Sequence, residues 1–185
     1  MKLILSLVLF FFLAQLSISQ NQKRVRDYGI EIGVLKPGEL NAITDVPGVQ
    51  VGHTTINEGD AIRTGVTAIL PHQGNVFQQK VPAAIYIGNG FGKLAGYTQV
   101  KELGNLETPI ILTNTLSVAT AINALVGYTL DLLGNENVRS VNAVVGETND
   151  GYLNDIRGRN VTEKMVLDAI ANASNGSVKE GNVGA

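Results

Sequence analysis

The densest group of polar side chains lies in one stretch, residues 146–158 (GETNDGYLNDIRG), directly after an apolar run at 141–145. Loops that follow strands often carry the binding and catalytic groups of folds built from a sheet and helices. Here Glu147 has the charge to pair with a substrate ammonium group, and the Tyr152 hydroxyl can donate a hydrogen bond to a developing oxyanion. Asn149 lies on the same loop, and we predict that it and Glu147 contact a substrate.

An alternative explanation of this loop stays open, namely a turn held by Asx hydrogen bonds with a surface pair between Arg157 and Asp155. Asn114 presents a similar choice, because it follows an apolar run and precedes a helical pattern. Either Asn114 faces the same cleft as the loop and binds substrate, or it belongs only to a helix start capped by Ser117.

Other kinds of chemistry find little support in the residue types. The chain of 185 residues has no Cys, only two His (His53 and His72) and a net charge of -2 with 16% charged residues. A zinc site needs a tight ligand cluster, and neither His has a second ligand at helical spacing. In Gly88–Lys93 only three residues separate the first Gly from the Gly-Lys pair, whereas a P-loop requires four. We therefore predict no metal, no cofactor and no nucleic-acid partner.

The elements that would position these residues alternate along the chain. Apolar, β-branched runs between turn signals predict five strands, at 49–56, 65–70, 83–87, 109–113 and 141–145. Apolar residues at steps of three or four predict helices at 92–103, 117–133 and 160–173, the last with Asn160 as N-cap. The nearly uninterrupted apolar runs at 109–113 and 141–145 favour strands covered on both faces, in a layered domain of sheet and helix.

The two ends of the chain differ from the middle. Residues 1–20 combine Lys2, an apolar run at 3–14 and small polar residues, which is typical of a secretory signal peptide and predicts export to the periplasm or medium. Residues 174–185 (SNGSVKEGNVGA) are small, polar and glycine-rich. We expect them to be disordered; the alternative is a chain that stops partway through a larger fold.

Several strings resemble the DmpA/BapA-type aminopeptidases, that is, the L-aminopeptidase D-amidase/esterases and the β-peptidyl aminopeptidases. The resemblance runs in order from about residue 28 to the end. It is carried by the strings at 41–46 (NAITDV), 63–69 (RTGVTAI), 112–118 (LTNTLSV), 146–158 and 180–185 (EGNVGA).

The resemblance implies an α+β fold, a four-layer αββα sandwich like that of the N-terminal-nucleophile hydrolases, of which residues 21–185 would form the N-terminal part. It also implies a self-cleaving precursor whose new N-terminal Ser is nucleophile and, through its amine, base. The substrates would be small peptides, amides or esters, the partner a complementary β-subunit chain, and the full-length form a homo-oligomer.

Tyr152 aligns with a tyrosine that this family places in its active site. The family's nucleophile, oxyanion-hole Asn and later Ser/Glu pair lie downstream of the string in which Ala185 falls, so we expect this chain alone to be inactive. Two other functions stay open: a non-catalytic binding protein on the same fold, and an enzyme like ornithine acetyltransferase, against which the signal peptide argues.

Overall fold

The computed structural model describes residues 23–185, and the predicted signal peptide at 1–20 lies outside the described residues. The chain divides into two compact units, the first ending at Leu35 and the second comprising Lys36–Ala185. In the first unit the described residues contain one 3₁₀ turn, Val25–Tyr28, closed by Gly29 in the left-handed conformation. All candidate site residues belong to the second unit.

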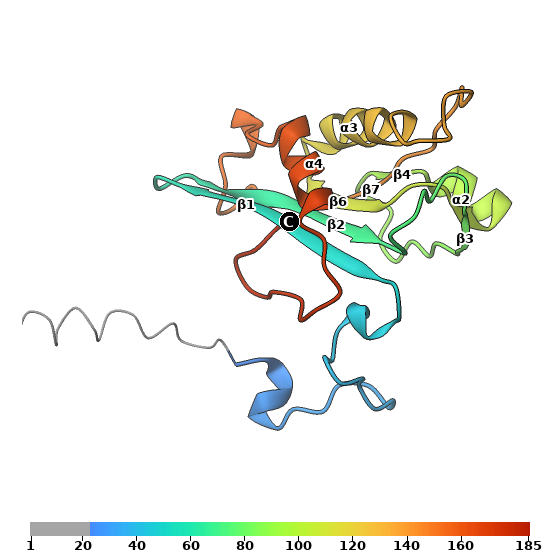
Figure 1. Ribbon diagram of the computed structural model, residues 1–185. Coiled ribbons are helices and arrows are strands. Elements are labelled where there is room, and N and C mark those ends of the chain that lie inside the picture. Colours follow the sequence, from blue (N-terminus) through green and yellow to red (C-terminus); the bar gives the residue numbers. More distant parts are fainter. Residues whose placement is uncertain (1–22) are drawn as a thin grey trace, which may run out of the picture. The chain divides into compact units, whose positions relative to one another are not determined.

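The second unit is built on a five-stranded mixed sheet with the order β1-β2-β6-β7-β4 (Figure 1). Its strands are β1 (Gln50–Glu58), β2 (Ile62–Leu70), β4 (Leu94–Ala95), β6 (Ile110–Asn114) and β7 (Val144–Thr148). β1 and β2 form a hairpin that pairs along its whole length, and β6 and β7 are the one parallel pair in the described residues. These strands confirm four of the five predicted runs to within a few residues.

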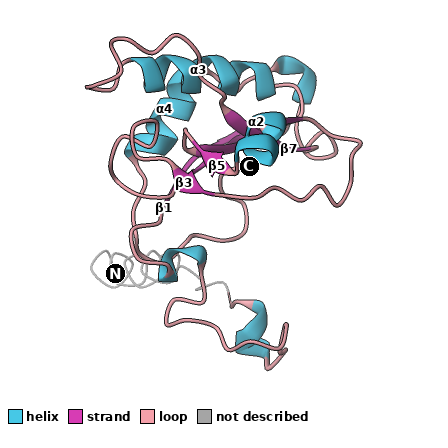
Figure 2. Cartoon of the chain, turned by 90° about the vertical axis from the view of Figure 1, so that its right-hand side faces the viewer, coloured by secondary structure: helices cyan, strands magenta, loops and turns pink. Residues whose placement is uncertain are grey.

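Helices α3 (Val118–Leu130) and α4 (Glu163–Ala171) cover one face of this sheet (Figures 1 and 2). α3 is the crossover that joins the parallel strands β6 and β7, as such a connection requires. Between helices and sheet lies a cluster of buried apolar side chains that includes Val66, Ile111, Leu125, Val145 and Val166. Burial of this cluster is the main force that holds the helices on the sheet.

α4 begins later than the sequence predicts, because Thr162 and not Asn160 is its N-cap. The Thr162 hydroxyl accepts a hydrogen bond from the Met165 N–H. Val161, which precedes the N-cap, and Val166 are buried in the same cluster, and these are the two positions of a hydrophobic staple.

The predicted strand at 83–87 is wrong. Only Val81–Pro82 (β3) is paired there, with Asn105–Leu106 (β5) in a separate two-stranded sheet. Ala83 and Ile85 pack against a small second cluster formed by Val100, Leu106 and Val144, so this apolar run reflects packing on one side without a ladder partner. The predicted helix at 92–103 is shorter, because β4 precedes Gly96, which has φ +79°, and α2 spans only Tyr97–Leu103.

The segment at 174–185, for which the sequence predicts disorder, contacts the β1-β2 hairpin in the structure. Ser174 forms a bridge to Val51 at the edge of β1, and the Gly184 N–H donates to Thr55 Oγ1 at 2.8 Å. The contacts are made by backbone groups rather than apolar side chains, which is why hydrophobic patterning gives no sign of them. Short 3₁₀ turns at Ile43–Asp45 and Ile156–Gly158 complete the regular structure.

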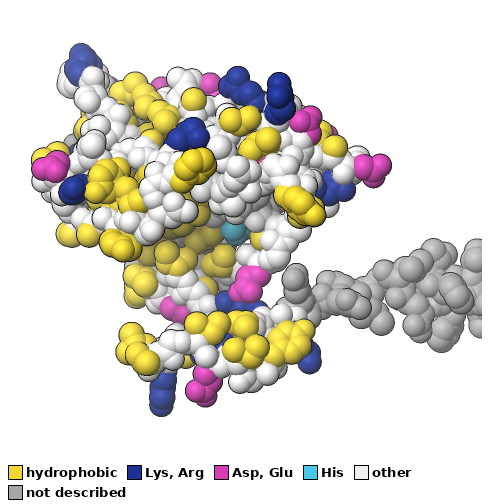
Figure 3. All heavy atoms as spheres, turned by 180° about the vertical axis from the view of Figure 1, so that it is seen from behind, with side chains coloured by type: hydrophobic (Ala, Val, Ile, Leu, Met, Phe, Trp, Pro, Cys, Tyr) yellow, Lys and Arg dark blue, Asp and Glu magenta, His cyan; other side chains and the backbone are white. Residues whose placement is uncertain are grey.

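The architecture is one helical layer on one mixed sheet, which are two of the four layers of the predicted αββα sandwich. Large apolar side chains are nonetheless exposed on this unit, among them Tyr86, Phe91 and Leu133, and hydrophobic groups gather in several surface patches in the view from behind (Figure 3). No helix within residues 23–185 combines the length and apolar character needed to span a bilayer.

Candidate active site

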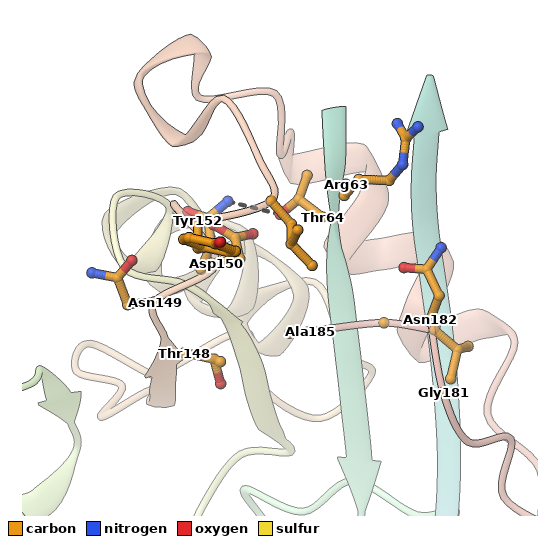
Figure 4. Close-up of a pocket in the computed structure, with 13 residues that line it drawn as sticks. Arg63, Thr64, Thr148, Asn149, Asp150, Tyr152, Gly181, Asn182 and Ala185 are labelled. Carbon is orange, nitrogen blue, oxygen red and sulfur yellow. Dashed lines mark hydrogen bonds between the residues drawn. The ribbon is translucent and has the colours of Figure 1, made fainter. Parts of the chain in front are cut away.

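A cavity of about 300 Å³ opens where strands β6 and β7 end (Figure 4). Because the two strands are parallel and in register, Asn114 and Thr148 are partners, and the residues that follow them meet at one edge of the sheet. Three segments line the cavity: the start of β2, the two strand ends with the following loop, and the chain at 181–185. Its lining residues are Arg63, Thr64, Asn114, Thr148, Asn149, Asp150, Tyr152, Leu153 and residues 181–185.

Asn114 is fixed in place by hydrogen bonds at both ends of its side-chain amide. It is 2% exposed; Nδ2 donates to Thr64 Oγ1 at 2.9 Å, and Oδ1 accepts from the Leu116 N–H at 3.2 Å. Ser117 occupies the predicted N-cap position of α3, but its hydroxyl makes no cap hydrogen bond and is buried with no partner among the described residues. Asn114 thus orders the turn that leads into α3, and its amide is held rigidly beside the cavity.

The loop after β7 is held against β2 by Asn154. Its Oδ1 accepts from the Arg63 N–H at 3.1 Å, and its Nδ2 donates to Asp150 Oδ1 at 3.1 Å. Asn149 Oδ1 accepts from the Gly151 N–H at 3.0 Å, which is the Asx turn considered as the alternative explanation. The turn and the cavity therefore coexist, and Asn149 and Tyr152 both belong to the cavity lining.

Tyr152 lies on the cavity wall with its side chain almost entirely open to solvent, at 97% exposure. A phenol in this position can donate a hydrogen bond to a ligand without first breaking a bond within the protein. The Arg63 guanidinium is not available in the same way, because it donates to the carbonyls of Glu58, Gly59 and Ile62 in the hairpin turn.

Glu147 lies outside this cavity, on the other side of the strand end. Successive side chains of a strand point to opposite faces, and Thr148 is the neighbour that lines the cavity. Glu147 Oε2 instead forms a salt bridge with Lys93 Nζ at 2.9 Å, and Oε1 lies 3.5 Å from Thr115 Oγ1. It borders a second pocket, of about 400 Å³, formed with the glycine-rich loop at 88–93.

The structure thus brings Asn114, Asn149 and Tyr152 together and separates Glu147 from them. It adds three features that the sequence does not assign to a site: Asp150 on the cavity wall, Asn154 behind it, and the backbone of 181–185. The string at 180–185 carries part of the family resemblance, but no hydrophobic pattern assigns it to a cavity wall.

Metal-binding geometry is missing from the described part of the chain. Within residues 23–185 no three His, Cys, Asp or Glu side chains lie close enough together to hold an ion. Each His is engaged elsewhere: His53 Nδ1 lies 3.0 Å from Thr67 Oγ1, and His72 Nε2 lies 2.8 Å from the Gln79 carbonyl oxygen.

Comparison with known proteins gives consistent results. The β-peptidyl aminopeptidase BapA of Sphingosinicella microcystinivorans is 40% identical over 173 residues, which are 87% of this chain and 42% of that protein. The structure of a Burkholderia sp. β-aminopeptidase matches with a TM-score of 0.82 and 47% identity, over 88% of this chain and 46% of that one.

A third match is the L-aminopeptidase D-Ala-esterase/amidase of Ochrobactrum anthropi, described as a prototype for the serine aminopeptidases and a new variant of the Ntn-hydrolase fold. Its TM-score is 0.77 at 37% identity, and the match covers 87% of this chain and 47% of that one. This chain therefore spans about half the length of the relatives it matches.

The predicted mixed fold agrees with these structures, and residues 41–185, which include every candidate site residue, match the peptidase family S58. As the resemblance to the DmpA/BapA-type aminopeptidases predicts, the chain belongs to peptidase family S58.

Proposed function

We propose that this chain forms the N-terminal half of a serine aminopeptidase that removes N-terminal residues from small peptides, amides or esters. The observation that carries the proposal is the cavity at the ends of β6 and β7, in a chain that matches β-aminopeptidases over 87–88% of its own length. In this proposal the cavity holds the substrate, and the nucleophile comes from the part of the relatives that this chain does not span.

The groups of the cavity suit such a substrate. The Asp150 carboxylate and the Asn149 amide oxygen can accept hydrogen bonds from a substrate amine, and the Tyr152 hydroxyl can donate to a carbonyl oxygen that gains charge. Glu147 is a second carboxylate at the same strand end, and the prediction that it pairs with a substrate ammonium group stays open. For that, Lys93 would have to leave Glu147 Oε2.

The proposed nucleophile is the N-terminal Ser of a complementary β-subunit. Its free α-amine, with a pKa near 8, can take the Ser proton, so the reaction needs no His among the residues of this chain. We also propose that residues 1–20 direct export, and that the complete enzyme assembles into homo-oligomers.

The test is an assay of the chain alone and with its missing half. The purified chain is mixed with a polypeptide corresponding to the remaining part of the Burkholderia sp. β-aminopeptidase. Both samples are assayed with L-alanyl, D-alanyl and β-alanyl p-nitroanilides. We expect release of p-nitroaniline from the mixture and none above buffer from the chain alone.

Two results would contradict the proposal. Equal turnover by the chain alone would place the nucleophile within residues 1–185. A stable complex of the two halves without turnover, but with binding of the p-nitroanilides, would favour the alternative of a non-catalytic binding protein.

A further inference from the structure

The backbone at 183–185 forms one wall of the candidate site, and it rests on the face of the sheet that the helices do not cover. The Gly184 N–H donates to Thr55 Oγ1 at 2.8 Å, and the Ala185 N–H donates to Thr67 Oγ1 at 3.3 Å. Thr55 lies on β1 and Thr67 on β2. Two threonine hydroxyls on adjacent strands thus hold this wall of the cavity.

Thr67 is in turn held by His53. The two residues are directly opposite each other in the β1-β2 ladder, and His53 Nδ1 lies 3.0 Å from Thr67 Oγ1. Cross-strand pairs of this kind fix each other's side-chain conformations. A continuous chain of contacts therefore runs from the imidazole through the threonine hydroxyl to the backbone of Ala185.

The fit between this pair and the backbone leaves no space. A Cβ at Gly184, which has φ +66°, would collide with Thr67 Oγ1 and lie 2.7 Å from His53 Nδ1. A Cβ at Gly65 would collide with the Gly184 carbonyl oxygen. The course of the segment is therefore set by direct contact with His53 and Thr67, and glycine is required on both sides of that contact.

The second ring nitrogen of His53, Nε2, makes no contact within residues 23–185 comparable to that of Nδ1 with Thr67. Nε2 is buried without a hydrogen-bond partner among the described residues, which is unfavourable for folding. Burial, together with the positive charge of Lys179, lowers the pKa of His53, so the ring is neutral at neutral pH and Nδ1 can serve the threonine hydroxyl as donor or acceptor. His53 thus destabilises the fold through its unpaired Nε2, while its Nδ1 contacts the threonine that holds the cavity wall. A residue that costs stability and contacts a site in this way indicates a functional role.

We infer that His53 is a positioning residue that, through Thr67, fixes the backbone of residues 183–185 and so shapes the cavity opposite Asn114 and Tyr152. The contacts of His53 and Thr67 with this segment do not depend on the proposed function. Only the description of the cavity as a substrate site rests on it.

The test measures hydrogen exchange of single backbone amides by NMR in the full chain, which requires no activity. Three variants are compared with the unmodified chain: His53→Ala, the conservative His53→Asn, and Thr67→Val, which keeps the side-chain shape but removes the hydroxyl. His72→Ala is the matched control, because the His72 ring bonds within its own loop, to Gly74 and Gln79.

We expect the amide of Ala185 to exchange about tenfold faster in His53→Ala and in Thr67→Val, since one net hydrogen bond contributes about that factor to local opening. His53→Asn should restore much of the protection, and His72→Ala should change nothing at Ala185. In enzyme completed with the missing half, His53→Ala should raise KM more than it lowers kcat.

Unchanged exchange at Ala185 in Thr67→Val would overturn the inference, and this variant decides the question even if His53→Ala fails to fold. Equal exchange in His53→Ala and the unmodified chain would also overturn it. If no form of the enzyme shows turnover, the proposed function fails, whereas the exchange result still decides the role of His53.

Discussion

The two faces of the sheet are built by different means. The face under α3 and α4 is covered by aliphatic side chains, such as Val66, Ile111 and Leu125, whose burial holds the helices in place. On the opposite face, near β1 and β2, the Thr55 and Thr67 hydroxyls accept hydrogen bonds from a backbone segment, and His53 Nδ1 contacts the Thr67 hydroxyl. The comparison indicates that the first face supplies stability, while the second face and the adjacent strand ends supply the geometry of the site.

The largest effect should follow from a cavity on the helix-covered face. Leu125 is fully buried on α3, and Leu125→Ala should lower the free energy of unfolding by about 2–5 kcal/mol through lost burial and an unfilled void. Urea unfolding measures this change. The matched control is Leu133→Ala, since Leu133 is 91% exposed; a loss at Leu133 as large as at Leu125 would show that the face is assigned wrongly.

A smaller loss of stability is expected at the site edge. Asn154→Ala removes the acceptor of the Arg63 N–H and the donor to Asp150, and an unpaired buried group costs about 1–3 kcal/mol. The same urea experiment measures this loss, with the exposed Asn137→Ala as control. Faster amide exchange across residues 148–155 should accompany it. A variant with unaltered stability and exchange would show that Asn154 does not hold the loop.

The histidine of the open face predicts a pH dependence of stability. Burial and Lys179 lower the pKa of His53 below its ordinary value of 6.5, so between the lowered pKa and 6.5 the unfolded chain binds more protons than the folded one. Stability therefore falls as the pH falls through this window. His53→Asn should reduce the difference between unfolding midpoints measured at about pH 7.5 and about pH 5. An identical pH difference in both proteins would contradict the assignment.

The smallest effect is expected at the ion pair beside the second pocket. The Lys93 side chain is 56% exposed and Glu147 only 12%, and a salt bridge with so exposed a partner contributes about 0–1 kcal/mol to stability. Lys93→Ala should therefore leave the urea midpoint nearly unchanged. A loss above about 2 kcal/mol would mean that the pair holds the loop at 88–93 in place.

The helix-covered face was largely predictable from the sequence, and the open face was not. The periodicity of 117–133 and the apolar runs at 109–113 and 141–145 report burial against a core, and α3, β6 and β7 confirm them. The run at 83–87 shows the limit of that signal, because Ala83 and Ile85 are packed on one side without a strand partner. The hydrophobic pattern of a segment predicts its burial, whereas the pairing of strands depends on residues distant in the sequence.

The site was predictable in part, through its loop. Asn114, Asn149 and Tyr152 meet because β6 and β7 are parallel neighbours, a relation that the apolar runs alone do not specify. The separation of Glu147 from them depends on strand register, which a single residue of shift would reverse. The wall at 183–185 is made of backbone groups, for which the sequence has no pattern other than its glycines.

The most direct test of whether this cavity is the substrate site uses enzyme completed with the missing half of a relative. kcat/KM for an alanyl p-nitroanilide is measured for Tyr152→Phe and Asn114→Ala, with Asn123→Ala on the exposed side of α3 as control. We expect each cavity variant to lower kcat/KM by about 10- to 1,000-fold, while the control keeps the unmodified value. Unchanged kcat/KM in both cavity variants would contradict the claim that this cavity is the substrate site.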